Sequence, residues 1–390
     1  MTPMAHPVIN PEIGLAPVEG GYLAYDRVAE RLHELNAMGA LIAELCDGSR
    51  SVEDIRALTG ALLPEGQGAE IERWIGEGID AGLLVWGDGA AIPHRELCAS
   101  ELSSLAGRLL EDGMAPSAFL CAKRVTELAP EDPDAWCALG WAAQAAGRRQ
   151  EAGVAYEKYL EDRSEDAPIR HLLTALKDEA PPPRASNECI VQMFREFSPY
   201  YDAKMRENLS YQAPERLQEL ICAEIGAAAG LEILDMGCGT GLVGVALRER
   251  AAHLAGIDLS PEMIEFARGR GVYDQLEVAE ITEWLDQSRA QFDLIAACDC
   301  LVYFGDLGPV TLSAARRLKP GGCFAFTVER GQRHPFHLAD SGRYTHHPGY
   351  VREVAAEAGL LVARLEDSFL RTEGGLEVTG LLALLRKSAS

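Results

Sequence analysis

The chain has 390 residues, of which 47% are hydrophobic and 25% are charged, so it is long enough for two or three globular domains. Its formal net charge of −24 argues against a nucleic-acid partner, because such binding needs clustered Lys and Arg side chains. No apolar run approaches the roughly 20 residues that span a bilayer, so we expect no membrane partner.

The N-terminus lacks the basic and apolar regions of a secretory signal. The ten cysteines are scattered, and none shows a zinc-like spacing. Cys298 and Cys300 form a C-x-C pair, but they lie where a strand should end, which favours a structural position over a metal site. We therefore expect reduced thiols, no bound metal and a cytoplasmic location.

The first segment, residues 1–95, contains two short strands at 20–26 and 30–36, followed by three helices at 37–46, 51–63 and 70–81. Ser51 is a suitable N-cap for the second helix. The third helix is amphipathic, with apolar residues at helical spacing. Strands followed by three short helices predict a small winged-helix-like α+β domain.

Three blocks of this segment, L-x-x-L-N near residue 36, S-V-E-D-I from Ser51 and A-G-L-L from Ala81, resemble the PqqD-like family. The resemblance implies a recognition domain for the leader of a ribosomally made peptide. The leader would add a strand in a groove between residues 30–35 and 70–81. A packing or dimerisation domain is the alternative. A DNA-binding domain is less expected, because residues 1–95 hold 15 acidic and 6 basic side chains.

The second segment, residues 96–180, contains an internal repeat. Trp136, Gly140 and Ala152 fit the tetratricopeptide pattern, and a step back of about 34 residues carries Trp136 to Leu102 and Ala152 to Ala118. We expect paired antiparallel helices that pack against a neighbouring domain, with a short helix at 169–177 as the cap of the stack. Residues 179–184 then form a proline-rich linker.

The third segment, residues 186–390, carries the most informative motif. An apolar strand ends in Asp235, glycines follow at 237, 239 and 241, and a second apolar strand ends in Asp258. The glycines let the backbone approach a ligand, and an acid after the second strand can bind ribose hydroxyls. The spacing differs from the G-x-G-x-x-G fingerprint of dinucleotide sites. Asp235 would repel a pyrophosphate but attract a sulfonium and an ammonium group.

The D-x-G-x-G-x-G motif and the sequence D-L-S-P-E-M from Asp258 resemble class I S-adenosylmethionine-dependent methyltransferases. The sequence around residues 193–214, together with the tetratricopeptide pattern, resembles the tetratricopeptide-bearing members of that family. This resemblance covers the chain from about residue 100 to its end. The resemblance implies a Rossmann-like, seven-stranded domain that binds S-adenosylmethionine. The expected cofactor-binding residues are Phe197, Tyr201, Asp235, Gly237, Cys238, Gly239, Thr240, Gly241, Asp258, Leu259, Met263, Glu280, Ile281 and Asp299.

On the acceptor side, Asp299 follows the fourth strand, and the G-R-Y-x-H block supplies Tyr344 and His346. The resemblance implies that this block contacts the substrate, where a His can accept a proton. Asp299, Tyr344 and His346 are therefore the catalytic candidates. The L-K-P-G-G block at 318–322 predicts a turn, and residues 379–385 predict a last, antiparallel strand.

These observations predict a multidomain α/β protein that methylates a ribosomal peptide held through its leader. One alternative is a methyltransferase for a small metabolite, with the first two domains serving assembly. The other is a non-catalytic protein that senses S-adenosylmethionine. The sequence leaves the acceptor atom and the oligomeric state open, with a homodimer as one alternative.

Overall fold

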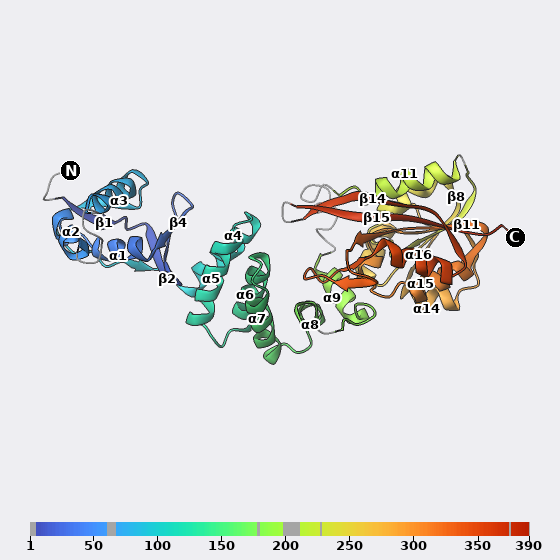
Figure 1. Cartoon of the computed structure of the whole chain (residues 1–390), viewed down its shortest axis with the longest axis horizontal. Coiled ribbons are helices and arrows are strands. Elements are labelled where there is room, and N and C mark those ends of the chain that lie inside the picture. The colour runs from blue at the N-terminus through green and yellow to red at the C-terminus, as the bar shows by residue number, and fades with distance from the viewer. Residues whose placement is uncertain are drawn as a thin grey trace. The chain divides into compact units, whose positions relative to one another are not determined.

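The computed structural model describes residues 5–60, 68–177, 180–197, 211–226, 228–373 and 376–389. The chain divides into two compact units, Met1–Asp162 and Arg163–Ser390 (Figure 1).

The first unit is built around a sheet with the strand order β4-β3-β2-β6. Its strands are β2 (Ile13–Val18), β3 (Gly21–Asp26), β4 (Arg31–Asn36) and β6 (Arg95–Glu96), and a separate pair joins β1 (His6–Ile9) to β5 (Leu84–Gly87). Helices α1 (Ala37–Leu45), α2 (Val52–Gly60) and α3 (Gly68–Asp80) share a hydrophobic core with β2 and β3.

The two strands and three helices that we predicted here are confirmed. We did not predict β1, β2, β5 and β6. Pro7 lies in β1, and Gly14 and Pro17 lie in β2, and because these residue types are uncommon inside strands the two segments did not stand out as strands in the sequence.

Four helices complete the first unit, namely α4 (Ala99–Glu111), α5 (Ala115–Leu128), α6 (Pro133–Ala145) and α7 (Arg149–Asp162). Successive helices pack against each other. Within the same unit they also contact the strands and turns of the sheet, since Arg108 donates to the Tyr25 hydroxyl at 2.9 Å and Lys123 pairs with Glu19 at 2.6 Å. The short helix expected to cap this stack, α8 (Ala167–Leu176), instead belongs to the second unit, where it packs on α9 (Asn187–Phe197).

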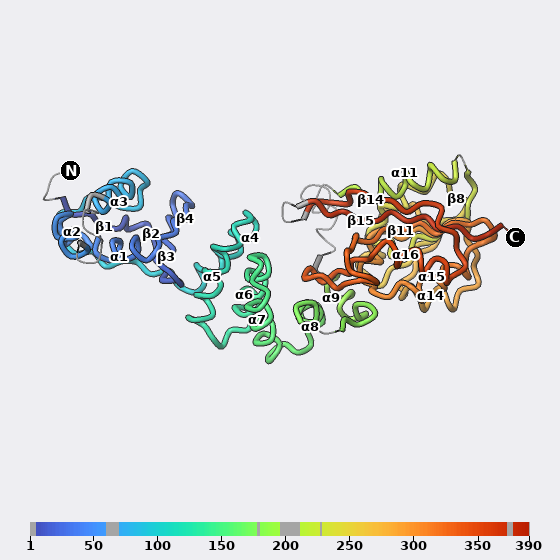
Figure 2. Tube along the Cα trace, in the orientation of Figure 1, coloured from blue at the N-terminus to red at the C-terminus, as the bar shows by residue number. Residues whose placement is uncertain are grey.

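The second unit contains a mixed sheet with the strand order β14-β15-β11-β10-β7-β8-β9. Strands β7 (Leu231–Met236), β8 (Ala251–Asp258), β9 (Gln275–Val278), β10 (Phe292–Ala297) and β11 (Leu318–Arg330) pair in parallel. The long hairpin of β14 (Leu360–Glu373) and β15 (Leu376–Lys387) adds an antiparallel edge, as predicted for residues 379–385, and can be followed in Figure 2. The small hairpin of β12 (Phe336–Leu338) and β13 (Tyr344–His346) pairs with the end of β11.

Helices cover both faces of this sheet. On one face, α11 (Ala213–Ile225) and α12 (Leu242–Leu247) form a core with Ile233 of β7. On the other face, α14 (Ile281–Gln287), α15 (Gly308–Arg317) and α16 (Pro348–Glu357) form a core with Leu234. Burial on both faces explains why the parallel strands are continuous apolar runs. The Rossmann-like sheet predicted from the sequence is confirmed, and the carboxyl ends of its strands meet at one edge.

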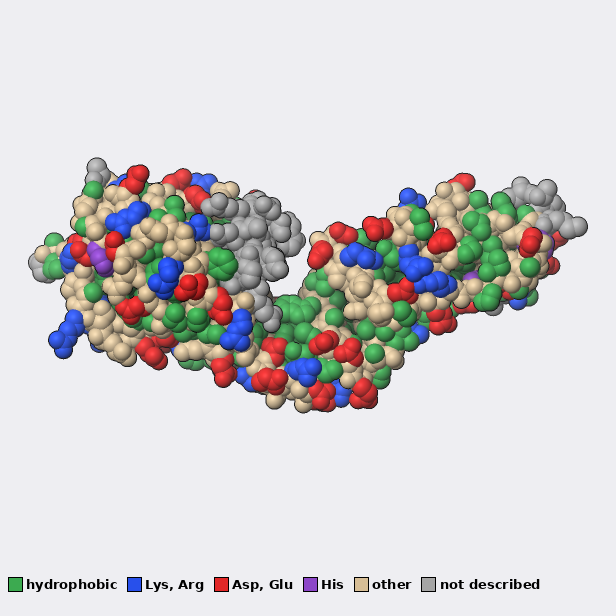
Figure 3. Space-filling model, turned by 180° about the vertical axis from the view of Figure 1, so that it is seen from behind, with side chains coloured by type: hydrophobic (Ala, Val, Ile, Leu, Met, Phe, Trp, Pro, Cys, Tyr) green, Lys and Arg blue, Asp and Glu red, His purple; other side chains and the backbone are tan. Residues whose placement is uncertain are grey.

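The predicted turn at 318–322 is present inside β11. The register of β11 against β10 shifts between the pairs Phe292–Leu318 and Leu294–Cys323, and Gly321 has a left-handed φ of 79°. No described helix is long and apolar enough to cross a membrane. On the face drawn in Figure 3, Lys and Arg side chains are interspersed with Asp and Glu.

The close approach of α6 and α7 gives a test of the first unit. A Cβ on Gly140 would lie 2.2 Å from Cε1 of Tyr156, which is fully buried. We expect Gly140→Ala to lower the free energy of unfolding by about 1–3 kcal/mol, because the core cannot take up the added methyl group. The control is Gly153→Ala in α7, where a Cβ meets nothing within 4 Å. Equal chemical-denaturation midpoints for the two variants would contradict this packing.

Candidate active site

The glycine turn between β7 and α12 forms one wall of the site. Gly237, Gly239 and Gly241 have left-handed φ values of 62°, 53° and 91°, which glycine adopts without strain. A Cβ on Gly237 would lie 2.4 Å from the Cβ of Cys300, whereas a Cβ on Gly239 would meet nothing within 4 Å. The turn therefore presents bare backbone to the space that Gly239 faces.

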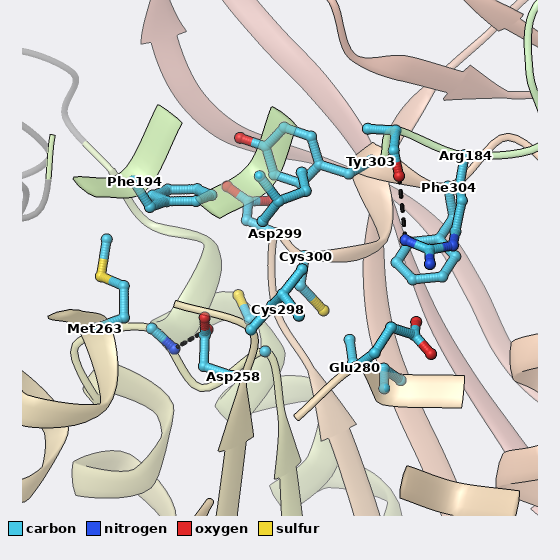
Figure 4. Close-up of a pocket in the computed structure, with 16 residues that line it drawn as sticks. Arg184, Phe194, Asp258, Met263, Glu280, Cys298, Asp299, Cys300, Tyr303 and Phe304 are labelled. Atoms are coloured by element: carbon cyan, nitrogen blue, oxygen red, sulfur yellow. Dashed lines mark hydrogen bonds between the residues drawn. The ribbon is translucent and has the colours of Figure 1, made fainter. Parts of the chain in front are cut away.

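Asp258 ends β8 and ties this turn to the next helix. Its Oδ2 accepts from the backbone N–H of Gly239 and its Oδ1 from that of Ser260, both at 2.9 Å (Figure 4). Burial raises the pKa of the Asp258 carboxyl, and the backbone donors of Ser260, Gly239 and Leu259 partly offset this. A carboxylate has about four acceptor positions, so acceptor capacity remains for a ligand hydroxyl group.

Glu280 follows β9 and is the N-cap of α14. Its Oε2 accepts from the backbone N–H of Glu283 at 2.8 Å. Its Oε1 is buried and has no hydrogen-bond partner among the described residues. A buried acceptor without a partner costs about 1–3 kcal/mol, so this oxygen requires a donor such as an amino group. The exocyclic amine of adenine fits that requirement.

A pocket connects these groups, with an empty volume of about 670 Å³ that includes its open mouth. In Figure 4, Asp258, Cys298 and Cys300 lie between Phe194 and Met263 on one side and Glu280, Arg184 and Phe304 on the other. Among the described residues, no cluster of three His, Cys, Asp or Glu side chains is placed to hold a metal ion. The predicted residues that line the pocket are Gly237, Gly239, Asp258, Leu259, Met263, Glu280, Ile281 and Asp299.

Four predicted cofactor residues do not line the pocket, namely Asp235, Cys238, Thr240 and Gly241. Asp235 is 1% exposed and accepts from the Tyr273 hydroxyl at 2.7 Å. The Tyr273 ring fills the space beside Gly244, where a Cβ would lie 2.2 Å from its hydroxyl oxygen. Asp235 thus supports the glycine turn from behind.

Phe197 and Tyr201, the aromatic residues predicted to bind the cofactor, lie in a segment that the structure describes only in part. Tyr201 lies outside the described residues, and of Phe197 only the backbone, at the end of α9, is described. Phe194, one turn earlier on α9, lines the pocket and packs edge-on against Tyr303 with ring centroids 5.9 Å apart.

Tyr344 and His346 were expected to contact the substrate, and the structure brings neither to the pocket. Tyr344 is fully buried, and its hydroxyl donates to the carbonyl oxygen of Pro182 at 2.7 Å. His346 is also fully buried, with Nε2 3.1 Å from the carbonyl oxygen of Gly305, and burial lowers its pKa to about 4. Both side chains hold neighbouring segments in place.

Asp299, the third catalytic candidate, does line the pocket. It has a left-handed φ of 53°, and its carboxylate accepts from Thr327 at 3.1 Å and pairs with Arg371 at 3.3 Å. Left-handed backbone in a non-glycine residue costs free energy and is concentrated at functional sites.

Eight lining residues were not predicted, namely Arg184, Ala185, Ile190, Phe194, Cys298, Cys300, Tyr303 and Phe304. The described part of the proline-rich linker packs against the residues that follow β10. Ala185 donates to the carbonyl oxygen of Tyr303, and Gly305 and Asp306 donate to that of Pro183, each at 2.8 Å. The proline run predicts an extended segment, but no residue in it indicates what that segment binds.

The burial of the Asp235 carboxyl can be tested through the pH dependence of the free energy of unfolding. Burial raises the pKa of its carboxyl from 3.8 to about 7, so between these values the folded chain binds a proton that the unfolded chain releases. Its ionisation therefore removes stability as the pH rises through this window. Relative to the wild type, we expect Asp235→Asn to gain about 1–3 kcal/mol of unfolding free energy between about pH 5 and pH 8. A pH-independent difference in chemical denaturation would contradict the buried ionisation.

Much of this site lies in a segment whose sequence matches a family of known proteins. Residues 233–322 match the family described as "Methyltransferase domain". A ubiquinone biosynthesis O-methyltransferase from Xylella fastidiosa (strain 9a5c) is 37% identical over 107 residues, which are 26% of this chain and 44% of that protein. This chain thus matches less than half the length of that relative.

Solved structures to which this chain shows similarity include the [4+2]-cyclase SpnF, with a TM-score of 0.44 and 18% identity over 53% of this chain and 99% of that one. Another is magnesium protoporphyrin IX methyltransferase from Synechocystis PCC 6803 with bound SAM, with a TM-score of 0.37 and 14% identity over 60% of this chain and 97% of that one. The sequence match carries the conclusion that this chain contains a methyltransferase domain of the class that uses S-adenosylmethionine.

Proposed function

We propose that this chain is a methyltransferase that modifies a ribosomally made peptide held by its first unit. The observation that carries the methyl-transfer part is the pair of buried carboxylates, Asp258 and Glu280, beside an open glycine turn. When bound, S-adenosylmethionine supplies a methyl group on a positively charged sulfur. Asp258 would hold the ribose hydroxyls, Glu280 the adenine amine, and the backbone of the glycine turn the amino-acid end.

The chain's own contribution to the chemistry is mostly positional. Holding two reacting groups in line is worth roughly 7–11 kcal/mol. Asp299 and Tyr303 lie on the side of the pocket next to Phe194, where an acceptor could enter (Figure 4). A general base is required only for an acceptor that is protonated and weakly nucleophilic.

The peptide part of the proposal is supported by the edge of the first unit's sheet. Among the described strands, β4 pairs only with β3, so its outer edge is unpaired. The residue after helix α3 contacts the first residue of β4, and a side chain of α3 and one of β4 lie against the same residue of α1. Arg31 donates to the carbonyl oxygen of Ala81 at 3.3 Å, and Trp74 and Leu35 both border the Cβ position of Gly39. An open edge beside a helix is suited to accept an extended peptide as an added strand.

A small-molecule acceptor is the second candidate, favoured by the names of the matched relatives, which concern ubiquinone biosynthesis. A chain shortened to Arg163–Ser390, which is one compact unit and keeps the linker on its pocket, separates the two candidates. Full activity of this shortened chain on a small acceptor would favour the second candidate.

The leader requirement is tested with a candidate precursor peptide from a reading frame beside the gene and labelled S-adenosylmethionine. Tethering raises the local concentration of a weakly bound site, so we expect kcat/KM to fall about 100-fold when the leader is removed. Trp74→Ala should raise KM for the leader-bearing peptide, and Trp141→Ala, on exposed α6 surface, should leave it unchanged. Equal turnover with and without the leader would reject peptide capture, and absence of any labelled product would favour a sensing protein.

Glu280 gives a test of the cofactor pocket. Glu280→Gln should lower the affinity for S-adenosylhomocysteine about tenfold or more, because an amide N–H₂ would replace an acceptor beside the adenine amine. The control is Glu283→Gln, an exposed position on the same helix that contributes only its backbone N–H. Isothermal calorimetry measures both, and equal affinities would show that Glu280 does not contact the ligand.

A further inference from the structure

Five polar side chains form a connected series behind the pocket, and the side chain at each end of the series lines the pocket. Arg371 of β14 pairs with Asp299 at 3.3 Å and also with Glu329 of β11, and Arg343 pairs with Glu329 at 3.6 Å. The Tyr303 hydroxyl lies within hydrogen-bonding reach of the Arg343 guanidinium. Asp299 and Tyr303 line the pocket, and the three residues between them do not. We call these residues the charge chain.

The charge chain is buried. The side chains of Arg371, Asp299 and Glu329 are 3%, 9% and 10% exposed, and that of Arg343 is 25% exposed. Removing ions from water costs several kcal/mol each, and pairing offsets this only where the geometry is good. Two guanidinium groups balance two carboxylates here. Hydrophobic residues would fill the same space at less cost, so stability alone does not account for the arrangement.

The charge chain fixes the two side chains at its ends. Asp299 has one carboxylate oxygen bound to Thr327 and the other to Arg371, so its orientation is set from two sides. Tyr303 is set by Arg343 at its hydroxyl and by Phe194 edge-on against its ring. Glu329 joins the two guanidinium groups, so the positions of Asp299 and Tyr303 depend on each other. Figure 4 shows the two side chains close together above Cys298 and Cys300.

We propose that Tyr303 and Asp299 form the acceptor subsite and that Arg343 and Arg371 are its positioning residues. This inference rests on the proposed methyl transfer and deepens it. Each Asp299 oxygen keeps acceptor capacity, and its negative charge disfavours an anionic group. The subsite therefore takes an acceptor with a hydroxyl or amino group at or beside the methylated atom, rather than a carboxylate. In the G-R-Y-x-H block, Arg343 reaches the site, and Tyr344 and His346 do not.

The test reads out Tyr303 directly. Difluorotyrosine, whose phenol is more acidic, is placed at position 303, and its fluorine resonance is titrated with saturating S-adenosylhomocysteine present. Burial raises the pKa of Tyr303, and nearby Arg343 opposes this increase. Arg343→Gln should therefore raise the measured pKa by about one unit, a tenfold change in ionisation. Arg343→Lys, which keeps the charge, should largely restore it.

The matched control is Arg330→Gln, which removes a guanidinium on an exposed ion pair with Asp367 and should leave the titration unchanged. All variants should bind S-adenosylhomocysteine within about twofold of the wild type by calorimetry, which also shows that they are folded. With the precursor peptide as the probe, Tyr303→Phe should raise KM for the peptide at least tenfold without changing this affinity.

The outcomes distinguish a failure of the proposed methyl transfer from a failure of the proposed acceptor subsite. If the wild type does not bind S-adenosylhomocysteine, the proposed function fails. If it binds and methylates, but Arg343→Gln leaves the Tyr303 titration unchanged, or Tyr303→Phe leaves KM and kcat unchanged, the acceptor subsite is rejected while the methyl transfer stands.

Discussion

Burial of carboxylates at the ends of parallel strands is the constraint on which the site depends. Asp258 and Glu280 are both under 10% exposed, and within the described part of the chain neither forms an ion pair with a cation. Asp258 is held by backbone N–H groups, and one oxygen of Glu280 has no partner among the described residues. Such groups are costly unless a ligand supplies donors. Ribose hydroxyls and an adenine amine supply such donors.

The second unit builds its pocket from segments that are far apart in sequence. The glycine turn and Asp258 come from the first half of the sheet, Asp299 and Tyr303 follow β10, and Arg184 comes from the linker before the sheet begins. The linker is held by backbone hydrogen bonds to residues 303–306, and the Tyr344 hydroxyl bonds its Pro182. Tyr344 of the G-R-Y-x-H block thus bonds the linker, and the linker in turn forms part of the pocket wall.

Much of this architecture could be predicted from the sequence, because the patterns that indicate it involve residues close together in the chain. The apolar runs that end in Asp235 and Asp258, the alternate glycines and the final hairpin each depend on residues near one another in the chain. The roles of Tyr344, His346 and Arg184 could not be predicted in this way. Each depends on a tertiary contact across more than 40 residues, and the side chain's chemistry alone does not indicate burial. For Asp235, the position at the end of its strand was predicted, but its hydrogen-bond partner, Tyr273, was not.

We expect this pocket to hold a sulfonium cofactor by its ribose at Asp258, by its adenine at Glu280 and by its amino-acid end at the glycine turn. A calorimetric titration of the full chain with S-adenosylmethionine and, separately, with NADH tests it most directly. The account predicts one molecule of S-adenosylmethionine bound per chain and no binding of NADH. Tight binding of NADH with no measurable heat from S-adenosylmethionine would contradict it.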